Sequence, residues 1–483
     1  MNLGLTINLV GILNLFLALA LVVPLLVSLA YRDGAAWCFI YSIALTLAAS
    51  LLMFVCTRKK DDRREIRHRE GMAVVALGWF TAGIFGALPF YLSGEFPSYL
   101  DSLFEAVSGF TTTGASILTK VEGLPAGLLF WRSMTHWLGG MGIIVLTIAI
   151  LPFLGVGGMQ LFKAEVPGPV ADRLQPRITE TAKELWKVYL VLTGAQVLLL
   201  HWGGMNLFDS FCHTFGTLAT GGFSTKNASI GHYDSVYFDV VITVFMLLSG
   251  LNFALHYQAL RGNFAPFFRN SELRFFLGVF AVGTLVAAWS TWRGDLLSPA
   301  QSLRHGAFQT ASILTTTGFA TIDYELWPPL AQLILVLCMF IGGSTGSTAG
   351  GVKCLRIMLL FKQGHRELRR LIHPRAVIQV KLRGRPVSDE IMNSVWGFFI
   401  LFVGLFLAAS VALAAMGLDL ATALTAAAAC IGNIGPGLGS VGPMENYAHL
   451  PDAAKAVLVL CMILGRLEVY TVLILFVPEF WKK

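Results

Sequence analysis

The sequence predicts an all-α polytopic membrane protein in which two additional N-terminal helices precede four pseudo-symmetric units. Three observations lead to this prediction. Hydrophobic residues make up 55% of the 483 residues and charged residues only 13%, and the mean hydropathy of +0.69 is far too high for an ordinary soluble protein. Apolar runs long enough to cross a bilayer recur along the chain. A short polar loop centred on a glycine also recurs four times.

About ten segments are candidates for membrane-spanning helices. A span needs about 20 apolar residues. Six runs approach or exceed that length, namely 7–29, 37–56, 128–154, 236–260, 395–416 and 456–477. Weaker candidates lie at 73–91, 185–202, 275–292 and 330–361. Helices are expected because the chain lacks the alternating strands of a membrane barrel. The first segment lacks a basic leader and is longer than a signal-peptide core, so we expect it to be retained.

The formal charge of +7 comes from basic residues that gather in a few clusters. In a ten-span topology with both termini on one side, that side carries 25 of the 35 lysines and arginines, in 58–69, 163–187, 261–274, 362–385 and 482–483. Such an asymmetry follows the positive-inside rule and predicts that both termini are cytoplasmic. The clusters are therefore interpreted as topology signals, and no nucleic-acid partner is expected.

Other functional classes find little support in the residue pattern. The seven cysteines show no CxxC spacing and the ten histidines no HExxH pattern, so neither a disulfide framework nor a metal-binding motif is predicted. An intramembrane enzyme would need paired aspartates, a Ser/His pair or metal-spaced histidines at membrane depth, and no such group is visible. We therefore do not expect an enzyme, and no catalytic residue is assigned.

The four recurring loops share a plan with the segments around them. They run from Thr111 to Ala115, from Ala219 to Phe223, from Thr315 to Phe319 and from Gly432 to Pro436. A stretch of about ten mostly apolar residues, too short to span a bilayer, precedes each loop. Asp101 and Asp209 lie where an N-cap would, so each short helix should start at the outer surface and point its C-terminus at the middle of the membrane. The negative end of its dipole then favours a cation.

Each unit thus reads as a span, a pore helix, a filter loop and a second span around one pore. The two extra N-terminal transmembrane helices occupy residues 1–70. The four pore units are expected at 71–182, 183–270, 271–388 and 389–483. A single loop of this kind could equally be a Gly/Thr turn between spans. Four such loops, each behind a half-helix and between two spans, favour a pore.

The chemistry of the loops suits an alkali cation. Glycine can present its carbonyl from backbone conformations closed to other residues, and threonine hydroxyls add further oxygens. Rings of such oxygens can replace the water shell of the ion without a full charge, which keeps binding loose enough for exit. The candidate filter residues are Thr112, Thr113, Gly114, Thr220, Gly221, Gly222, Thr316, Thr317, Gly318, Asn433, Ile434 and Gly435.

A glycine-rich break interrupts the apolar segment that follows the third loop. The break consists of Gly342, Gly343, Ser344, Thr345, Gly346, Ser347, Thr348, Ala349, Gly350 and Gly351. Such a segment should lose its helical structure at membrane depth, which is tolerated where the backbone lines a water-filled path or is buried in protein. We interpret it as a movable gate beneath the third filter loop. The alternative is a small-residue packing surface of the GxxxG type.

Two basic residues are associated with this gate. Lys353 follows the break at or within membrane depth. Arg466, with Glu468 two residues later, is an isolated charge in the last span, and an arginine at that depth usually faces a cavity or pairs with carbonyls or carboxylates. We expect Arg466 to reach the pore beneath the filter and to help hold the gate closed. Its alternative is to extend toward the cytoplasm.

With these features in place, the chain resembles the TrkH/KtrB superfamily of potassium transporters, and the TrkH branch in particular. The resemblance covers nearly the whole length, and the two extra N-terminal spans favour the TrkH branch. Besides the four loops and the break, it rests on Arg63 to Gly71, Trp131 to Gly142, Pro152 to Gln160, Gly221 to Thr225, Leu360 to Gly364 and Gly465 to Glu468.

The resemblance implies a homodimer in the bacterial inner membrane, with one K⁺-selective pore in each protomer and some Rb⁺ passage. It implies K⁺ ions at the filter carbonyls, no covalently bound cofactor, and control by a cytoplasmic nucleotide-binding ring of the TrkA type. The family's filter glycines match Gly114, Gly222, Gly318 and Gly435, its gating loop matches 342–351, and the arginine that contacts that loop matches Arg466. The fourth loop departs most from a Thr-Thr-Thr-Gly pattern. Serine at the first of these glycines would suggest Na⁺ passage, so Gly114 favours K⁺.

Some alternatives stay open at this point. A shared Na⁺/K⁺ pathway or a proton-coupled K⁺ symporter would use the same loops. The basic segment Lys362 to Arg385 is a candidate docking site for the regulatory ring, although topology explains its charge equally well.

Overall fold

The computed structural model describes residues 3–57, 68–142, 178–376, 378–382 and 385–482. Most of these residues are helical, so the prediction of an all-α membrane protein is confirmed. Several expected features lie outside the described residues. They are the end of the span 128–154, the motif Pro152 to Gln160, most of the basic cluster 58–69 and the first part of the cluster 163–187.

Three helices at the N-terminus form two spans. Helices α1 (Leu3–Ala20) and α2 (Val22–Tyr31) follow each other as one apolar segment of 29 residues, and α3 (Ala36–Thr57) returns beside α1. Helix α1 also contacts α4 of the next segment, and α2 contacts α7. The extra helices therefore pack against the side of the first unit.

The remaining helices and the single two-stranded sheet of the described residues follow the four predicted units, although α4 and α10 begin a few residues before the expected boundaries at 71 and 183. The first range holds α4 (His68–Gly86), α5 (Leu88–Ser93), α6 (Tyr99–Phe110) and α7 (Ala126–Gly140). The second holds α10 (Ile178–Trp202), α11 (Leu207–Leu218), η2 (Ser229–Tyr233), α12 (Val236–Ser249), α13 (Phe253–Leu260) and α14 (Ala265–Arg269).

The third range holds α15 (Ser271–Arg293), α16 (Pro299–Leu314), η3 (Tyr324–Leu326), α17 (Pro329–Met339), α18 (Cys354–Ile372), β1 (Lys381–Leu382) and β2 (Arg385–Pro386). The strands pair antiparallel, with Lys381 opposite Pro386. The fourth holds α19 (Asp389–Ala415), α20 (Leu420–Ile431), η4 (Gly439–Val441), α21 (Asp452–Arg466), α22 (Tyr470–Leu473), η5 (Ile474–Phe476) and α23 (Pro478–Trp481).

Four half-helices, α6, α11, α16 and α20, precede the four loops, and side-chain caps define where each begins. Ser98 caps α6, Asn206 caps α11 and Asp419 caps α20, each by accepting a backbone N–H three residues on. The prediction that Asp101 and Asp209 are N-caps is therefore wrong. Both are the third helical residue of their helix. A carboxylate at that position still interacts favourably with the positive end of the helix dipole.

Helix α16 is longer than expected. The stretch before the third loop was expected to have about ten residues, but it begins at Pro299 and has 16, behind a capping box in which Ser298 and Gln301 bond reciprocally. Proline at the first helical position is favoured because its missing N–H is one of the unsatisfied donors anyway.

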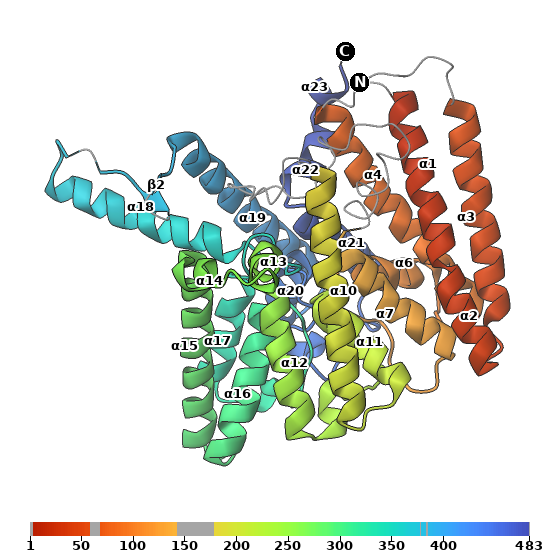
Figure 1. Ribbon diagram of the computed structural model, residues 1–483, viewed down its shortest axis with the longest axis horizontal. Coiled ribbons are helices and arrows are strands. Elements are labelled where there is room, and N and C mark those ends of the chain that lie inside the picture. The colour runs from red at the N-terminus through yellow and green to blue at the C-terminus, as the bar shows by residue number, and fades with distance from the viewer. Residues whose placement is uncertain (1–2, 58–67, 143–177, 377, 383–384, 483) are drawn as a thin grey trace.

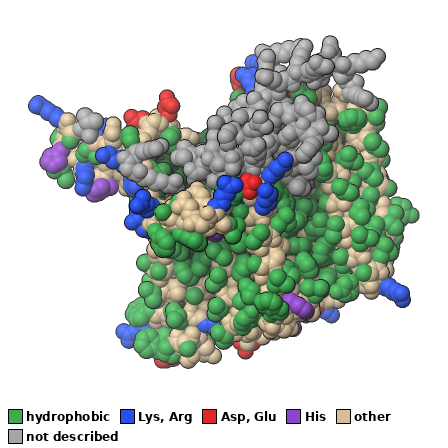
Figure 2. Space-filling model, in the orientation of Figure 1, with side chains coloured by type: hydrophobic (Ala, Val, Ile, Leu, Met, Phe, Trp, Pro, Cys, Tyr) green, Lys and Arg blue, Asp and Glu red, His purple; other side chains and the backbone are tan. Residues whose placement is uncertain are grey.

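The helices form a bundle whose sides are apolar. Figure 1 shows both chain ends at one face, which we name the terminal face, and the start of α16 at the opposite face, which we name the mouth face. Hydrophobic side chains cover the side of the bundle in Figure 2, whereas charged side chains gather toward its two faces. This distribution is typical of a protein whose sides contact lipid.

Fewer continuous spans are found than the ten expected. Among the described residues, six helical segments are long and apolar enough to cross a membrane, and two bent pairs raise the number to eight. The bent pairs are α12 with α13, at 103°, and α21 with the segment 470–476, at 113°. The expected span 330–361 is interrupted where the glycine-rich break was predicted. It consists of the 11-residue α17, the glycine break and α18, and Figure 1 shows α18 with β2 projecting from the bundle.

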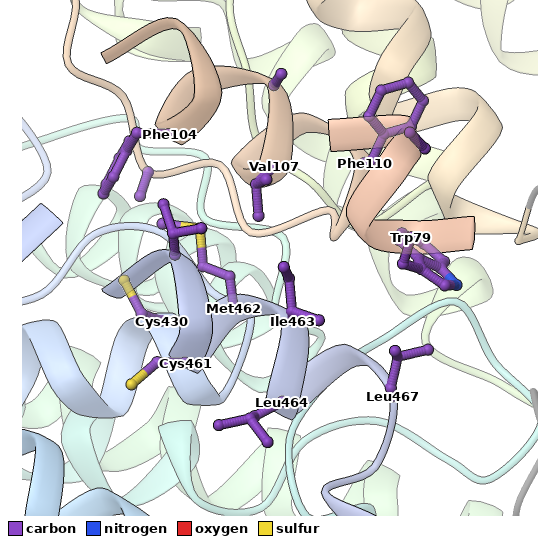
Figure 3. Packing of buried hydrophobic residues seen from close by; sticks show 14 of the residues in the cluster. Trp79, Phe104, Val107, Phe110, Cys430, Cys461, Met462, Ile463, Leu464 and Leu467 are labelled. Carbon is purple, nitrogen blue, oxygen red and sulfur yellow. The ribbon is translucent and has the colours of Figure 1, made fainter. Parts of the chain in front are cut away.

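The last span of the fourth unit closes the bundle against the first unit. Figure 3 shows Phe104, Val107 and Phe110 of α6 together with Met462 and Ile463 of α21 in one buried cluster. Helix α21 packs on α6, and α4 packs on the same half-helix. The first and fourth units are therefore neighbours, as a closed arrangement of four requires.

Candidate functional site

The four loops have the same backbone conformation. The second residue of each has a positive φ of 53° to 58°, and the glycine two residues later has a positive φ of 81° to 99°. The residues with positive φ are Thr112, Thr220, Thr316, Asn433, Gly114, Gly222, Gly318 and Gly435. A left-handed threonine is an outlier for a β-branched residue, so its occurrence at three equivalent positions indicates a conformation that the surroundings impose.

Each loop is tied to its own half-helix by the same hydrogen bond. The residue before the filter glycine donates its backbone N–H to the carbonyl five residues earlier. The four N···O distances are 2.9 Å for Thr113 to Ser108, 2.8 Å for Gly221 to Gly216, 2.7 Å for Thr317 to Ser312 and 2.8 Å for Ile434 to Ala429. These bonds satisfy carbonyls that the end of a helix otherwise leaves unpaired.

The loops form a closed ring in chain order. A Cβ atom added at Gly114 would lie 2.0 Å from the carbonyl oxygen of Gly221, and one at Gly222 would lie 2.0 Å from that of Thr317. A Cβ atom at Gly318 would lie 2.1 Å from Ile434 O, and one at Gly435 would lie 2.7 Å from Thr113 O. Every glycine thus abuts the next loop, and the fourth abuts the first. A side chain at any of the four would collide with the ring.

All four glycines also line one cavity of about 120 Å³. Its wall continues through the segments that follow the first, second and fourth loops. The cavity therefore lies on the mouth side of the ring, where the four glycines face one space.

The side-chain support differs from loop to loop. In the first loop the hydroxyl oxygens of Thr111 and Thr113 lie 2.8 Å apart, and in the third loop those of Thr315 and Thr317 lie 2.7 Å apart. In the fourth loop Asn433 Nδ2 donates to Thr113 Oγ1, at 3.0 Å, and to the carbonyl of Met462. The fourth loop is thus supported across the ring, which accounts for its departure from the threonine pattern.

Buried ion pairs join neighbouring units on the mouth side. Glu105 on α6 accepts from Arg132 Nε at 2.6 Å, and Arg132 also donates to the carbonyl of Ser224 after the second loop. Lys455 on α21 pairs with Asp101 on α6 at 2.6 Å. Sequence reasoning missed this role for Arg132 and Glu105. An acidic residue within an otherwise apolar half-helix was the available signal, because a buried carboxylate needs a partner.

The glycine break lies against the terminal side of the ring. Gly350 N donates to Thr316 Oγ1 at 2.7 Å, and Thr348 Oγ1 donates to the carbonyl of Leu218 at 2.9 Å. Positive φ values at Gly342, Gly346 and Gly351 fold the break into a compact loop, which we name the gating loop (residues 342–351). Its backbone therefore covers the terminal end of the path through the ring.

Side chains from distant segments hold the gating loop. Arg466 donates to the carbonyl of Thr348 at 2.8 Å and to that of Gly139 at 2.6 Å, so it bridges the loop and α7. Glu272, at the start of α15, accepts from Thr345 N at 2.6 Å. Lys353 donates to the carbonyl of Ala349 within the loop. Sequence reasoning included Arg466 and Lys353 but missed Glu272, whose partner is 73 residues away.

An ion pair lies next to this loop. Arg356 on α18 pairs with Glu468, which follows Arg466 at the break between α21 and α22. Glu468 and Val469 both have positive φ, near 53° and 60°. The bend of the last span is therefore linked to the helix that follows the gating loop.

Comparisons with known proteins agree with this arrangement. The TrkH family model, described as a cation transport protein, matches residues 37–483. The chain is 43% identical to the Trk system potassium uptake protein TrkH of Halomonas elongata over 100% of both chains. It is 43% identical to TrkH of Escherichia coli K12 over 99% of both. The crystal structure of the potassium transporter TrkH from Vibrio parahaemolyticus superposes with a TM-score of 0.89 at 38% identity, with 100% of both chains covered.

A family model over most of the chain and relatives at 43% identity over its full length establish the kinship. The resemblance predicted from the motifs is confirmed, as is the prediction that the protein is not an enzyme, because these relatives are transporters. The chain belongs to the TrkH family of cation transport proteins.

Proposed function

We propose that this protein takes up K⁺ through the ring of four filter loops. The observation that carries the proposal is the closed ring, in which each glycine abuts a carbonyl of the next loop. Such a ring offers neutral oxygens on every side of one path and can replace the hydration shell of an alkali cation. The hydroxyl of Thr112 supports the same reading, since it is buried and makes no hydrogen bond within the described residues. The relatives named as potassium uptake proteins support K⁺ as the ion.

The gating loop and Arg466 form the gate in this proposal. The loop covers the terminal end of the path. The positive charge of Arg466 beneath the ring repels a K⁺ ion that would leave the ring on that side. The arrangement is therefore a closed state. Opening requires the loop to leave Thr316, Glu272 and Arg466.

The remaining expectations complete the proposal. The terminal face lies in the cytoplasm, the membrane is the bacterial inner membrane, and the protein acts as a homodimer. A nucleotide-binding ring of the TrkA type docks on the terminal face and moves the gating loop through α18. The direct continuity of the gating loop with α18, which projects from the bundle, supports this route.

Uptake of ⁸⁶Rb⁺ into vesicles that contain the purified protein tests the proposal. Excess external K⁺ should suppress uptake, whereas the same excess of Na⁺ should leave most of it. Equal suppression by both ions would contradict K⁺ selectivity. Repeating the assay with and without a pH gradient separates a passive path from a proton-coupled one, because only the latter accumulates Rb⁺ at the expense of the gradient.

A further inference from the structure

The second filter loop lacks a side chain that the other three possess. The residue before the filter glycine is Thr113 in the first loop, Thr317 in the third and Ile434 in the fourth, but it is Gly221 in the second. Gly221 does not have a positive φ, so its backbone conformation is open to any residue. Something other than the backbone therefore requires glycine at this position.

The imidazole of His136 occupies the space. A Cβ atom added at Gly221 would lie 2.5 to 2.6 Å from three atoms of this ring. His136 belongs to α7 of the first unit, is fully buried, and stacks on Phe223 with a centroid separation of 4.1 Å. A side chain from the first unit thus fills the place that a threonine fills in the first and third loops.

The same ring makes two hydrogen bonds that fix its tautomer. His136 Nδ1 lies 2.8 Å from the carbonyl oxygen of Gly109, at the end of α6, and Nε2 lies 3.2 Å from the backbone nitrogen of Phe223. A carbonyl can only accept and an amide N–H can only donate, so Nδ1 carries the hydrogen and Nε2 accepts. The ring is therefore neutral, and it joins the first half-helix to the residue that follows Gly222.

We propose that His136 is a positioning residue for ion selection, which holds the second loop at the same distance from the pore axis as the other loops. The first and third loops have an internal pair of threonine hydroxyls, whereas Ala219 and Gly221 occupy those positions in the second loop. The second loop thus obtains from α7 the support that two others carry within themselves. This inference rests on the proposed K⁺ selectivity of the ring.

The first test removes the two hydrogen bonds of the His136 imidazole and keeps an aromatic ring in its place. In the ⁸⁶Rb⁺ assay, His136→Phe should lower the preference for K⁺ over Na⁺ about 10-fold, because a buried N–H next to Gly222 loses its acceptor. His136→Gln, whose amide can both donate and accept, should retain most of the preference. His305→Phe is the matched control, since His305 is also buried but bonds the hydroxyl of Thr321, which is not a residue of a filter loop.

The second test replaces the His136 imidazole behind the second loop with a threonine side chain at position 221, as in the first and third loops. Gly221→Thr alone should abolish the preference for K⁺, because its Cβ collides with the imidazole. Combining Gly221→Thr with His136→Ala removes the collision, and this double variant should prefer K⁺ more strongly than either single variant. A double variant no better than the two single ones would overturn the inference, as would a Gly221→Thr variant that behaves like the wild type.

A third measurement does not depend on transport. Binding of K⁺ to an intact ring should raise the melting temperature of the detergent-solubilised protein more than Na⁺ does, and His136→Phe should reduce this difference. A wild-type protein without any preference for K⁺ would refute the proposed function. A preference that persists in His136→Phe would refute only the role of His136. Where His136→Phe is not recovered as folded protein, the Gly221→Thr variants decide.

Discussion

The filter ring and the gating loop are adjacent in space but are held in opposite ways. Each filter loop is fixed by a backbone bond to its own half-helix, five residues earlier, and this bond recurs four times. The gating loop has no repeated pattern and is bonded to Thr316, Glu272 and Arg466, which are 34 to 118 residues away in sequence. Local bonds persist as long as the half-helix is folded, whereas separate distant contacts can be exchanged one by one. We therefore assign ion selection to the rigid filter ring, and opening to the gating loop, whose contacts can be exchanged.

The largest effect on selection is expected from Gly114→Ser. The new Cβ atom would lie 2.0 Å from the carbonyl oxygen of Gly221, at a φ of 81° that strains any side chain. The preference for K⁺ over Na⁺ in the ⁸⁶Rb⁺ assay should fall about 10- to 100-fold, since both the collision and the strain displace the ring. Gly94→Ser is the matched control, because Gly94 has a φ of 77° and nothing within 4 Å of its added Cβ. If both variants selected alike, the ring geometry would not determine the ion.

The largest effect on opening is expected from Arg466→Ala. Loss of the charged bonds to Thr348 and Gly139 removes about 2 kcal/mol from the closed state, which corresponds to a roughly 30-fold shift toward the open state. Vesicles that contain the variant alone should show a higher rate of Rb⁺ uptake, with the K⁺ preference unchanged. Arg466→Lys keeps the charge but not the fork of donors, so it should have an intermediate rate. An uptake rate equal to that of the wild type would remove Arg466 from the gate.

A smaller increase is expected from Glu272→Ala. The carboxylate of Glu272 accepts a hydrogen bond from Thr345 N of the gating loop, and loss of this bond should raise the uptake rate about 5-fold. The acidic residue also stabilises the first turn of α15. Glu390→Ala, in the first turn of α19, is the matched control, because it removes the same kind of helix interaction from an exposed position. Equal rates in the two variants would show that the bond to Thr345 does not hold the gate.

The same contrast determines how much could be predicted from the sequence. The ring is a local structure repeated four times, so the spacing of threonines and glycines was enough to locate its four loops. The starts of the half-helices were less accurate, because Asp101 and Asp209 were more conspicuous than the true caps, Ser98 and Asn206. The capping box at Ser298 was readable from the sequence as a Ser-x-x-Gln spacing, and it marks a start that the expected ten-residue stretch missed.

The position of the gating loop could be predicted from the sequence, but the residues that contact it could not. Its glycines predicted a break in the helix, yet nothing near residue 345 in the sequence indicates Glu272 as its partner. The same holds for His136, which supports a loop 87 residues away. Partners across the bundle are determined by the packing of whole helices, which the periodicity of a single segment does not contain. The missing information therefore concerns contacts between units and not the plan of one unit.

The smallest effect is expected from Thr315→Val, which removes one hydroxyl behind the third loop. Thr315 Oγ1 donates its only hydrogen to the carbonyl of Ala311, at 2.7 Å, so the hydrogen in its pair with Thr317 comes from Thr317. Valine preserves the shape of the side chain but leaves the Thr317 hydroxyl free to rotate. The backbone bond from Thr317 to Ser312 remains, so the K⁺ preference should fall only about twofold, which is less than one neutral hydrogen bond can contribute.

Thr315→Ser keeps the hydroxyl and should select as the wild type does. A loss in Thr315→Val as large as that in Gly114→Ser would mean that the backbone bond does not hold the loop alone, and that hydroxyl pairs carry the ring. The rigidity of the filter would then depend on exchangeable side-chain contacts like those of the gating loop. A twofold effect keeps the two regions distinct, because it leaves the repeated bond to the half-helix as the main support of every loop.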